Sequence, residues 1–286
     1  MTSTANPMRF RVGLAQMRSG RDVDANIADA IALIREAARL GAHYVQTPEV
    51  TTLMESDPAR LLAVSEPEAG NRALEAFAAA ARDCGVWLHI GSMGVKLDDR
   101  LLANRSYVFT PRGAVAARYD KIHMFDVDLG NGDVYSESAT YRPGVRAVLA
   151  ELPWGPLGLT ICYDLRFPAL HRALAKGGAK FLAAPAAFTR MTGEAHWHAL
   201  LRARAIETQS FVFAASQGGR HENGRETYGH SLIISPWGEI LAEAGSDPGV
   251  VVADIDVAVI DAVRRKIPSL DHDQAFELVT VEAEQA

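Results

Sequence analysis

Cys162 has the sequence surroundings of a nucleophile. It follows an apolar run at 157–161 and precedes the turn-forming residues Tyr-Asp-Leu-Arg-Phe-Pro, which predicts a buried strand that delivers the thiol to a sharp turn. Pro168 fits the first turn of a following helix, and Asp164 can accept hydrogen bonds from free amides nearby. Backbone N–H groups and a helix N-terminus lower the pKa of a thiol and can bind an oxyanion. A buried structural cysteine is the alternative interpretation.

Two charged residues, Glu49 and Lys121, also stand where predicted strands end. Glu49 follows the strand expected at 44–47, and Lys121 follows the hairpin expected at 107–119. Proteins of the α/β class place their chemistry at the carboxyl ends of their strands. Taken alone, however, Glu49 is more typical of a solvated loop.

Together, Glu49, Lys121 and Cys162 make a coherent hydrolytic set. A thiolate attacks an amide carbon, a carboxylate shuttles a proton, and an ammonium with a backbone amide stabilises the oxyanion. Cysteine is the best side-chain nucleophile near neutral pH, glutamate holds a proton when it is partly buried, and lysine supplies a compact positive charge. These three residue types therefore predict cleavage of an amide.

The elements that must position this set alternate between strands and helices, which predicts an α/β protein. Gly41 closes the first helix, and Pro111 with Gly113 supplies a hairpin turn. Apolar periodicity predicts strands at 10–16, 44–47, 86–90, 107–110, 114–119, 157–161, 180–187, 211–216, 231–235, 240–241 and 250–255, and helices at 22–40, 73–82, 168–176, 194–208 and 257–265.

The stretch from Met124 to Gly144 shows neither a helical nor an alternating period. It carries four acidic residues, among them Glu137. A structureless loop of about twenty residues inside a compact enzyme is usually functional. We therefore expect this loop to form a wall of the active site.

Charge and hydropathy exclude several classes of partner. The chain of 286 residues has a formal charge of −6, so it lacks the excess of positive charge that binds a phosphate backbone, and nucleic acid is not expected. Residues 1–8 have no signal-peptide core, and no apolar run reaches the ~18 residues of a membrane span. We expect a cytoplasmic protein that does not bind membranes.

Cysteine and histidine spacing predicts neither a disulfide framework nor a metal site. The chain has two cysteines, and Cys84 is expected to end a helix as a packing residue. His196 and His198 are two positions apart, so they do not share a face of a helix. No metal and no organic cofactor are predicted.

The three motifs, in this order, resemble the nitrilase superfamily of carbon–nitrogen hydrolases. Pro48-Glu49, Asp-Lys121-Ile-His and Ile-Cys162-Tyr-Asp-Leu-Arg-Phe-Pro match its Glu–Lys–Cys triad, and the likeness covers roughly residues 9–270. Lys-Ile-His-Met-Phe-Asp-Val-Asp, Gly-Glu-Ala-His-Trp and Pro-Trp-Gly are similar to the Nit group. Gly-Arg-His followed by Tyr-Gly-His-Ser is more similar to deaminated-glutathione amidases than to ω-amidases.

The resemblance implies a role for each matching residue at the reaction centre. Glu49 would be the general base, Lys121 an oxyanion ligand and Cys162 the nucleophile. The backbone amide of Tyr163 would be a second oxyanion donor. Glu137 would position the substrate or relay a proton.

The resemblance also implies a set of substrate-binding residues. Arg166 matches a position expected to face a substrate carboxylate, whereas Phe188 and Thr192 match positions that line the pocket. The segments 129–133 and 222–226 depart from the family pattern close to the expected substrate.

The fold implied is an α/β four-layer α-β-β-α sandwich of the nitrilase type. It would span residues 9–270 as one domain, after a disordered segment at 1–8. The tail at 271–286 would lie at the interface of a homodimer or of a larger homo-oligomer.

The activity implied is hydrolysis of the terminal amide of a small carboxylated substrate, through a thioester and with release of ammonia. Deaminated glutathione is the first candidate substrate. An ω-amidase that acts on α-ketoglutaramate or α-ketosuccinamate is the second. A binding protein of this fold that has lost turnover is an alternative of another class, and the intact triad argues against it.

Overall fold

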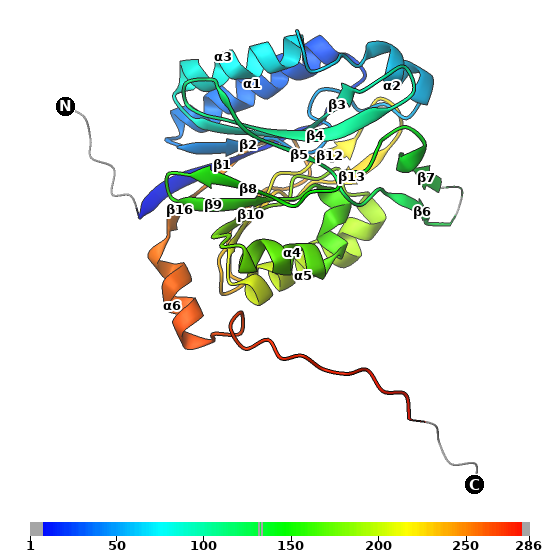
Figure 1. The fold of residues 1–286 in the computed structure, drawn as a ribbon. Helices are drawn as coiled ribbons and strands as arrows, with labels where there is room; N and C mark the ends of the chain where they lie inside the picture. The colour runs from blue at the N-terminus through cyan, green and yellow to red at the C-terminus, as the bar shows by residue number, and fades with distance from the viewer. Residues whose placement is uncertain (1–7, 131, 133, 282–286) are drawn as a thin grey trace, which may run out of the picture.

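The computed structural model of the protein describes residues 8–130, 132 and 134–281. Within them, two six-stranded sheets pack face to face, and helices cover the outer face of each sheet (Figure 1). The predicted four-layer α-β-β-α sandwich is therefore confirmed.

The first sheet has the order β16-β1-β2-β3-β4-β5. Strands β1, β2 and β3 run parallel, and the other neighbours pair antiparallel. Helices α1 (Val23–Arg39) and α3 (Arg72–Cys84) lie on its outer face, where Ile34 and Phe77 are fully buried. The strands are β1 (Arg9–Gln16), β2 (Tyr44–Gln46), β3 (Trp87–Lys96), β4 (Leu102–Phe109), β5 (Val115–Asp120) and β16 (Gly249–Asp256).

The second sheet has the order β15-β14-β11-β10-β9-β8. Its central strands β9, β10 and β11 are parallel, and helices α4 (Pro168–Lys176) and α5 (Arg190–Thr208) cover its outer face (Figure 1). The strands are β8 (Val148–Leu152), β9 (Gly155–Leu159), β10 (Phe181–Ala183), β11 (Phe211–Ala214), β14 (Leu232–Ile234) and β15 (Ile240–Glu243).

Aromatic side chains fill the space between the two sheets. Phe10 of the first sheet meets Phe181 of the second edge to face, with 5.3 Å between ring centroids. Phe181 stacks in turn against Phe213 at 5.6 Å. Because these rings are buried, they exclude water between the sheets and hold them at a fixed separation. The ends of strands from both sheets consequently meet at one edge of the sandwich.

Helix boundaries follow capping residues that the sequence displays. The Asp22 side chain accepts hydrogen bonds from the N–H groups of Asp24 and Ala25 and so caps α1. Helix α3 ends at Gly85, whose φ of 66° is the left-handed conformation that glycine adopts without strain. Helix α5 begins at Arg190, four residues before the predicted start.

Several predicted boundaries are wrong. Strand β3 does not end at Gly91 but continues to Lys96, and glycine is needed inside it because a Cβ there would lie 2.2 Å from the carbonyl oxygen of Thr47. Helix α2 (Pro58–Val64) and strand β8 were not predicted.

The loop at 124–144 is not structureless as expected. It contains the short hairpin strands β6 (Asp126–Asp128) and β7 (Val134–Ser136), followed by a 3₁₀ helix at Glu137–Ala139. Three-residue strands are too short for an alternating pattern to identify them.

The chain ends differ in how they join the sandwich. Met8, expected to be disordered, accepts a hydrogen bond at its carbonyl from the N–H of Val257, whereas residues 1–7 and 282–286 lie outside the described residues. After α6 (Ala258–Lys266), residues 271–281 form neither helix nor strand, and Phe276 is 91% exposed. The homo-oligomer and its interface stay predictions. The described residues contain no helix that is both long and apolar enough to cross a bilayer.

Candidate active site

The ends of β2, β5 and β9 bring the three predicted catalytic residues into one buried site. Glu49 lies three residues beyond β2, Lys121 directly follows β5, and Cys162 begins a 3₁₀ helix at Cys162–Arg166 after β9. All three are buried and line the same cavity.

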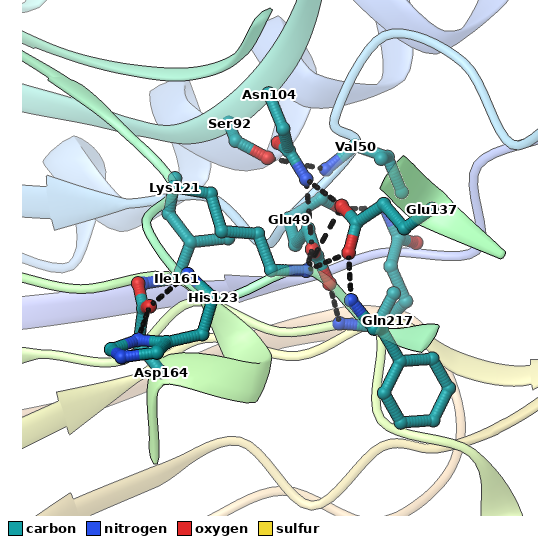
Figure 2. A network of polar contacts seen from close by, with 12 residues as sticks. Glu49, Val50, Ser92, Asn104, Lys121, His123, Glu137, Ile161, Asp164 and Gln217 are labelled. Atoms are coloured by element: carbon teal, nitrogen blue, oxygen red, sulfur yellow. Dashed lines mark hydrogen bonds and ion pairs between the residues drawn. The ribbon is translucent and has the colours of Figure 1, made fainter. Parts of the chain in front are cut away.

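Lys121 is the charged centre of the site (Figure 2). Its Nζ lies 2.8 Å from Oε1 of Glu49 and 2.8 Å from Oε2 of Glu137, and its side chain is 2% exposed. Burial alone would lower the pKa of Lys121, but the two carboxylates outweigh it and raise that pKa well above its usual value. The ammonium therefore stays charged although its side chain is buried.

Glu49 is held as an ionised acceptor. Its Oε1 accepts from Lys121 and from Nδ2 of Asn104 (3.0 Å), and its Oε2 accepts from the backbone N–H of Ala187 (2.9 Å). Burial acts to raise the pKa of Glu49, but Lys121 and a contact with the Cys162 thiol bring it below the usual value. Glu49 is therefore a carboxylate that can take the proton of Cys162.

The backbone around Glu49 is fixed on both sides. Gln217 donates its Nε2–H to the carbonyl of Glu49 at 3.0 Å, and the N–H of Val50 donates to Oγ of Ser92 at 3.0 Å (Figure 2). Val50 has a φ of 50°, which is strained for a β-branched residue. Such strain is typical of functional sites, where the surrounding contacts hold it in place.

Cys162 sits at the sharp turn that the sequence predicts. Its φ is 48°, and its N–H donates to the carbonyl of Pro185 at 2.9 Å. The expectation that this turn lowers the thiol pKa is wrong: burial and the Glu49 carboxylate raise the pKa of Cys162 well above its usual value, against the smaller opposing effects of Lys121 and the Ala187 N–H. The resting thiol therefore keeps its proton until a base removes it.

Two groups beside Cys162 can stabilise an oxyanion. The Lys121 ammonium interacts electrostatically with the thiol. The backbone N–H of Tyr163 lies in the first turn of the 3₁₀ helix, where N–H groups have no partner inside the helix. Both donors are fixed before substrate binds, which is the condition for effective stabilisation.

Glu137 is a second carboxylate of the buried cluster. Besides Lys121, it accepts a hydrogen bond from Nδ2 of Asn104 at 2.9 Å and one from the backbone N–H of Phe125 at 2.7 Å. The 3₁₀ helix that begins at Glu137 brings it from the β6–β7 hairpin to Lys121. Asn104 bridges Glu49 and Glu137, and sequence reasoning did not identify it because an asparagine inside a strand carries no distinctive pattern.

A cavity of about 540 Å³ opens above the cluster. The β6–β7 hairpin forms part of its wall through Val134, Tyr135 and Ser136, as expected for the 124–144 segment. Its other lining residues include the predicted positions Tyr163, Phe188 and Thr192, together with Leu53, Met54, Leu61, Phe125 and Arg225.

Arg166 lies outside the lining of this cavity. Its guanidinium packs 5.3 Å from the ring centroid of Phe188 and 6.0 Å from that of Tyr163, and its Nη2 lies 3.3 Å from Nδ1 of His196. Arg166 is not paired with the nearby Asp164, whose carboxylate accepts hydrogen bonds from Tyr119, His123 and Ile161. The role of Arg166 toward a substrate carboxylate stays a prediction.

Arg225 is the arginine that does line the cavity. Its Nη2 donates to the carbonyl of Ala187 at 2.6 Å, and its guanidinium lies 5.3 Å from the ring centroid of Tyr135. The signal for this residue was present in the sequence, since the segment 222–226 departs from the family pattern.

In the part of the chain that the structure describes, His, Cys, Asp and Glu side chains form no group of three or more that could hold a metal ion.

Comparison with known proteins identifies relatives of this chain. The carbon-nitrogen hydrolase family model matches residues 11–265. The deaminated glutathione amidase of Homo sapiens is 41% identical over 266 residues, which cover 91% of this chain and 81% of that protein. An omega-amidase of Xenopus tropicalis is 35% identical over 274 residues, which cover 96% of this chain and 98% of that protein.

Solved structures show the same fold. The C. elegans NitFhit protein superposes with a TM-score of 0.87 at 32% identity, over 93% of this chain and 65% of that one. An amidase from Nesterenkonia sp. AN1 superposes with a TM-score of 0.77 at 25% identity, over 94% of this chain and 98% of that one. That structure holds the acetamide moiety of fluoroacetamide covalently added at the active-site cysteine.

Proposed function

This chain belongs to the carbon-nitrogen hydrolase family, and we propose that, as an amidase of that family, it hydrolyses the amide of a small carboxylated substrate. Deaminated glutathione is the first candidate, because a relative of that name is 41% identical to this chain. The observation that carries the proposal is the buried Glu49–Lys121 pair beside Cys162 at the floor of the cavity.

The first half of the reaction forms a thioester. Glu49 takes the thiol proton as the sulfur of Cys162 attacks the amide carbon, which couples deprotonation of a thiol of high pKa to bond formation. Lys121 and the Tyr163 N–H stabilise the oxyanion of the tetrahedral intermediate. Protonated Glu49 then gives its proton to the leaving nitrogen, and the C–N bond breaks.

The second half of the reaction restores the enzyme. Glu49 removes a proton from water as the water oxygen attacks the thioester carbon. The second tetrahedral intermediate uses the same oxyanion donors, and the C–S bond breaks as the thiolate recovers its proton from Glu49. Glu137 keeps Lys121 in place throughout, through its own contact of 2.8 Å with Nζ.

The leaving group depends on the substrate. Deaminated glutathione has secondary amides, so its cleavage releases an amine. Ammonia release, as expected from the sequence, applies only to a primary amide such as α-ketoglutaramate. An assay for ammonia alone would therefore miss the first candidate.

An ω-amidase acting on α-ketoglutaramate or α-ketosuccinamate is the second candidate, supported by the 35% identity to the Xenopus protein. The cavity volume of about 540 Å³ favours the longer substrate, since such a volume lies within the range of about 300–1,000 Å³ that holds ligands of drug size. The five-carbon amide α-ketoglutaramate would fill only part of the cavity and leave the rest to water.

The test is an assay of the purified protein against deaminated glutathione, both ω-amides, neutral amides and nitriles, with acid and amine products measured separately. We expect turnover of a carboxylated amide and none with Cys162→Ala. Faster turnover of α-ketoglutaramate than of deaminated glutathione would favour the second candidate. Absence of turnover on every amide by the folded protein would reject an amidase in favour of a binding protein.

A further inference from the structure

We propose that Arg225 binds the carboxylate of the substrate and so determines selectivity for acidic amides. This inference rests on the amidase function proposed above and assigns its substrate recognition to a residue outside the predicted set. Three observations support it: Arg225 lines the cavity, its guanidinium has an N–H donor without an acceptor among the described residues, and the catalytic side chains around it carry a net negative charge.

Arg225 is held in a tight turn between two short strands. Strands β12 (Gly218–Arg220) and β13 (Glu226–Tyr228) pair antiparallel, and the connecting turn is closed by hydrogen bonds from the His221 N–H to the Arg225 carbonyl (2.8 Å) and from the Arg225 N–H to Oδ1 of Asn223 (3.1 Å). The turn carries Arg225 to the cavity that Cys162 lines. The contacts of its guanidinium with Ala187 and Tyr135 hold the Arg225 side chain in place, and a side chain that is already ordered loses little freedom when it binds a ligand.

Among the described residues, part of the Arg225 guanidinium has no hydrogen-bond partner. Nη2 donates to the Ala187 carbonyl, and the ring of Tyr135 lies 5.3 Å away and supports the guanidinium. Nε is buried, and among the described residues it has no hydrogen-bond acceptor. A guanidinium presents five N–H donors in a planar fork that matches a carboxylate. Buried donors are normally satisfied, so an unpaired one beside a cavity favours an acceptor on a ligand.

The charge of the site explains why a carboxylated substrate needs such a residue. Glu49 and Glu137 carry two negative charges around the single positive charge of Lys121. This cluster alone would repel an anionic substrate. Arg225 supplies a second positive charge, and its field reaches Glu49, whose pKa it helps to lower. With Arg225 the four side chains are neutral overall.

Ala187 connects the residue that would bind the substrate carboxylate to the residue that acts as general base. Ala187 donates its N–H to the general base Glu49, while its carbonyl accepts from Arg225. The base and the carboxylate receptor are thus fixed to the two sides of the same residue. A substrate held at Arg225 is placed in the cavity that exposes its amide to Cys162.

The experiment compares Arg225→Met and Arg225→Lys with Arg220→Met, which removes an exposed arginine from the same hairpin outside the cavity. Each variant is assayed on deaminated glutathione, α-ketoglutaramate and their methyl esters. For Arg225→Met we expect kcat/KM on the acids to fall by about 10²-fold, mainly through KM, and little change on the esters. Arg225→Lys should recover part of the loss, because it restores the charge without the fork. Arg220→Met should behave as wild type.

Equal losses on acids and esters would reject the inference and leave Arg225 as a support for Ala187. Loss of acid selectivity in Arg166→Met, with none in Arg225→Met, would assign the role to the predicted residue instead. Melting temperatures of all variants exclude unfolding as the cause.

A binding measurement keeps this inference separate from the proposed function. Cys162→Ala, with and without Arg225→Met, is titrated with α-ketoglutarate, the acid that both α-ketoglutaramate and deaminated glutathione would yield. We expect Arg225→Met to weaken binding by about 10²-fold. This result stands even if wild type hydrolyses no amide, whereas unchanged binding overturns the inference.

Discussion

Asp164 and His123 are joined by two hydrogen bonds to one oxygen. Oδ1 of Asp164 accepts from the backbone N–H of His123 at 3.0 Å and from Nδ1 of its ring at 2.7 Å (Figure 2). Asp164 lies two residues beyond Cys162, and His123 lies two residues beyond Lys121. The pair therefore ties the segment of the nucleophile to the segment of the oxyanion ligand.

The other oxygen of Asp164 completes this link. Oδ2 accepts from the N–H of Ile161 at 2.8 Å and from the hydroxyl of Tyr119 at 2.6 Å, and the Asp164 side chain is fully buried. Replacing it would leave several buried donors without an acceptor, which costs about 1–3 kcal/mol for each such group.

We predict that Asp164→Ala lowers the free energy of unfolding by about 3 kcal/mol and lowers kcat at temperatures where the variant is folded. Asp164→Asn should lose less stability because its amide oxygen still accepts. Urea unfolding and initial rates check both. Asp83→Ala, an exposed carboxylate on α3, is the control. Wild-type kcat in folded Asp164→Ala would show that the link does not position the catalytic groups.

The two cysteines should differ completely in function. Cys162→Ala is expected to abolish turnover, because Cys162 alone of the two lines the cavity beside Glu49 and Lys121. Cys84 ends α3 in the outer layer, and Cys84→Ala should keep wild-type kcat. Stoichiometric alkylation, located by mass spectrometry, should inactivate the enzyme only when Cys162 is modified. Full activity in Cys162→Ala would contradict the assignment.

Acid sensitivity should arise at His89, between the sheets. Its ring bonds to Tyr44, Gln46 and Ser106, all uncharged, and burial lowers the pKa of His89 to about 3. The unfolded chain binds this proton near pH 6.5. The stability due to neutral His89 is therefore complete above pH 6.5 and is lost as pH falls toward 3.

We expect the free energy of unfolding to decline between pH 6.5 and 3 more steeply in wild type than in His89→Gln, measured by urea unfolding across that range. His43→Gln, a histidine near the surface, serves as the comparison. Parallel pH profiles for wild type and His89→Gln would contradict a neutral buried His89.

Local patterns in the sequence predict most of the strands and the catalytic set, whereas the four-layer arrangement was implied by the resemblance to the nitrilase superfamily. Apolar patterns identify most long strands. Lys121 directly follows β5, and Glu49 and Cys162 each lie three residues beyond the ends of β2 and β9. The hairpin strands β6 and β7 are too short to show a pattern. Strand β3 continues past Gly91, where the backbone of Thr47 comes too close for any side chain. This contact belongs to the tertiary structure, so the local sequence does not reveal it.

Two properties of the site depend on contacts that no local pattern reveals. The pKa of Cys162 is raised by burial and by the Glu49 carboxylate, which lies beside the thiol although it is 113 positions earlier in the chain. The turn around the thiol predicts a lowered pKa, because the local sequence does not show how deeply the thiol is buried. Arg225 likewise reaches the cavity only through its hairpin, whereas Arg166, adjacent in sequence to the nucleophile, packs outside it.

The last prediction concerns Lys121, whose ammonium stands between Glu49 and Glu137. Lys121→Met removes the oxyanion charge, so kcat should fall by about 10²–10³-fold, while KM changes little. It also leaves two buried carboxylates without their shared cation, which should raise the pKa of Glu49 because Lys121 is a principal cause of its lowering. The acidic limb of kcat/KM should therefore move to higher pH in this variant.

Lys176→Met, which removes a half-exposed lysine of α4, is the matched control and should change neither kcat nor the pH profile. The pH profile separates two roles for Lys121. If the ammonium only positioned substrate, KM would rise, kcat would stay at the wild-type value and the acidic limb would not move. If it acts on the oxyanion and on Glu49 together, kcat falls and the limb shifts in the same variant. An unchanged kcat with a raised KM would thus reject Lys121 as an oxyanion ligand.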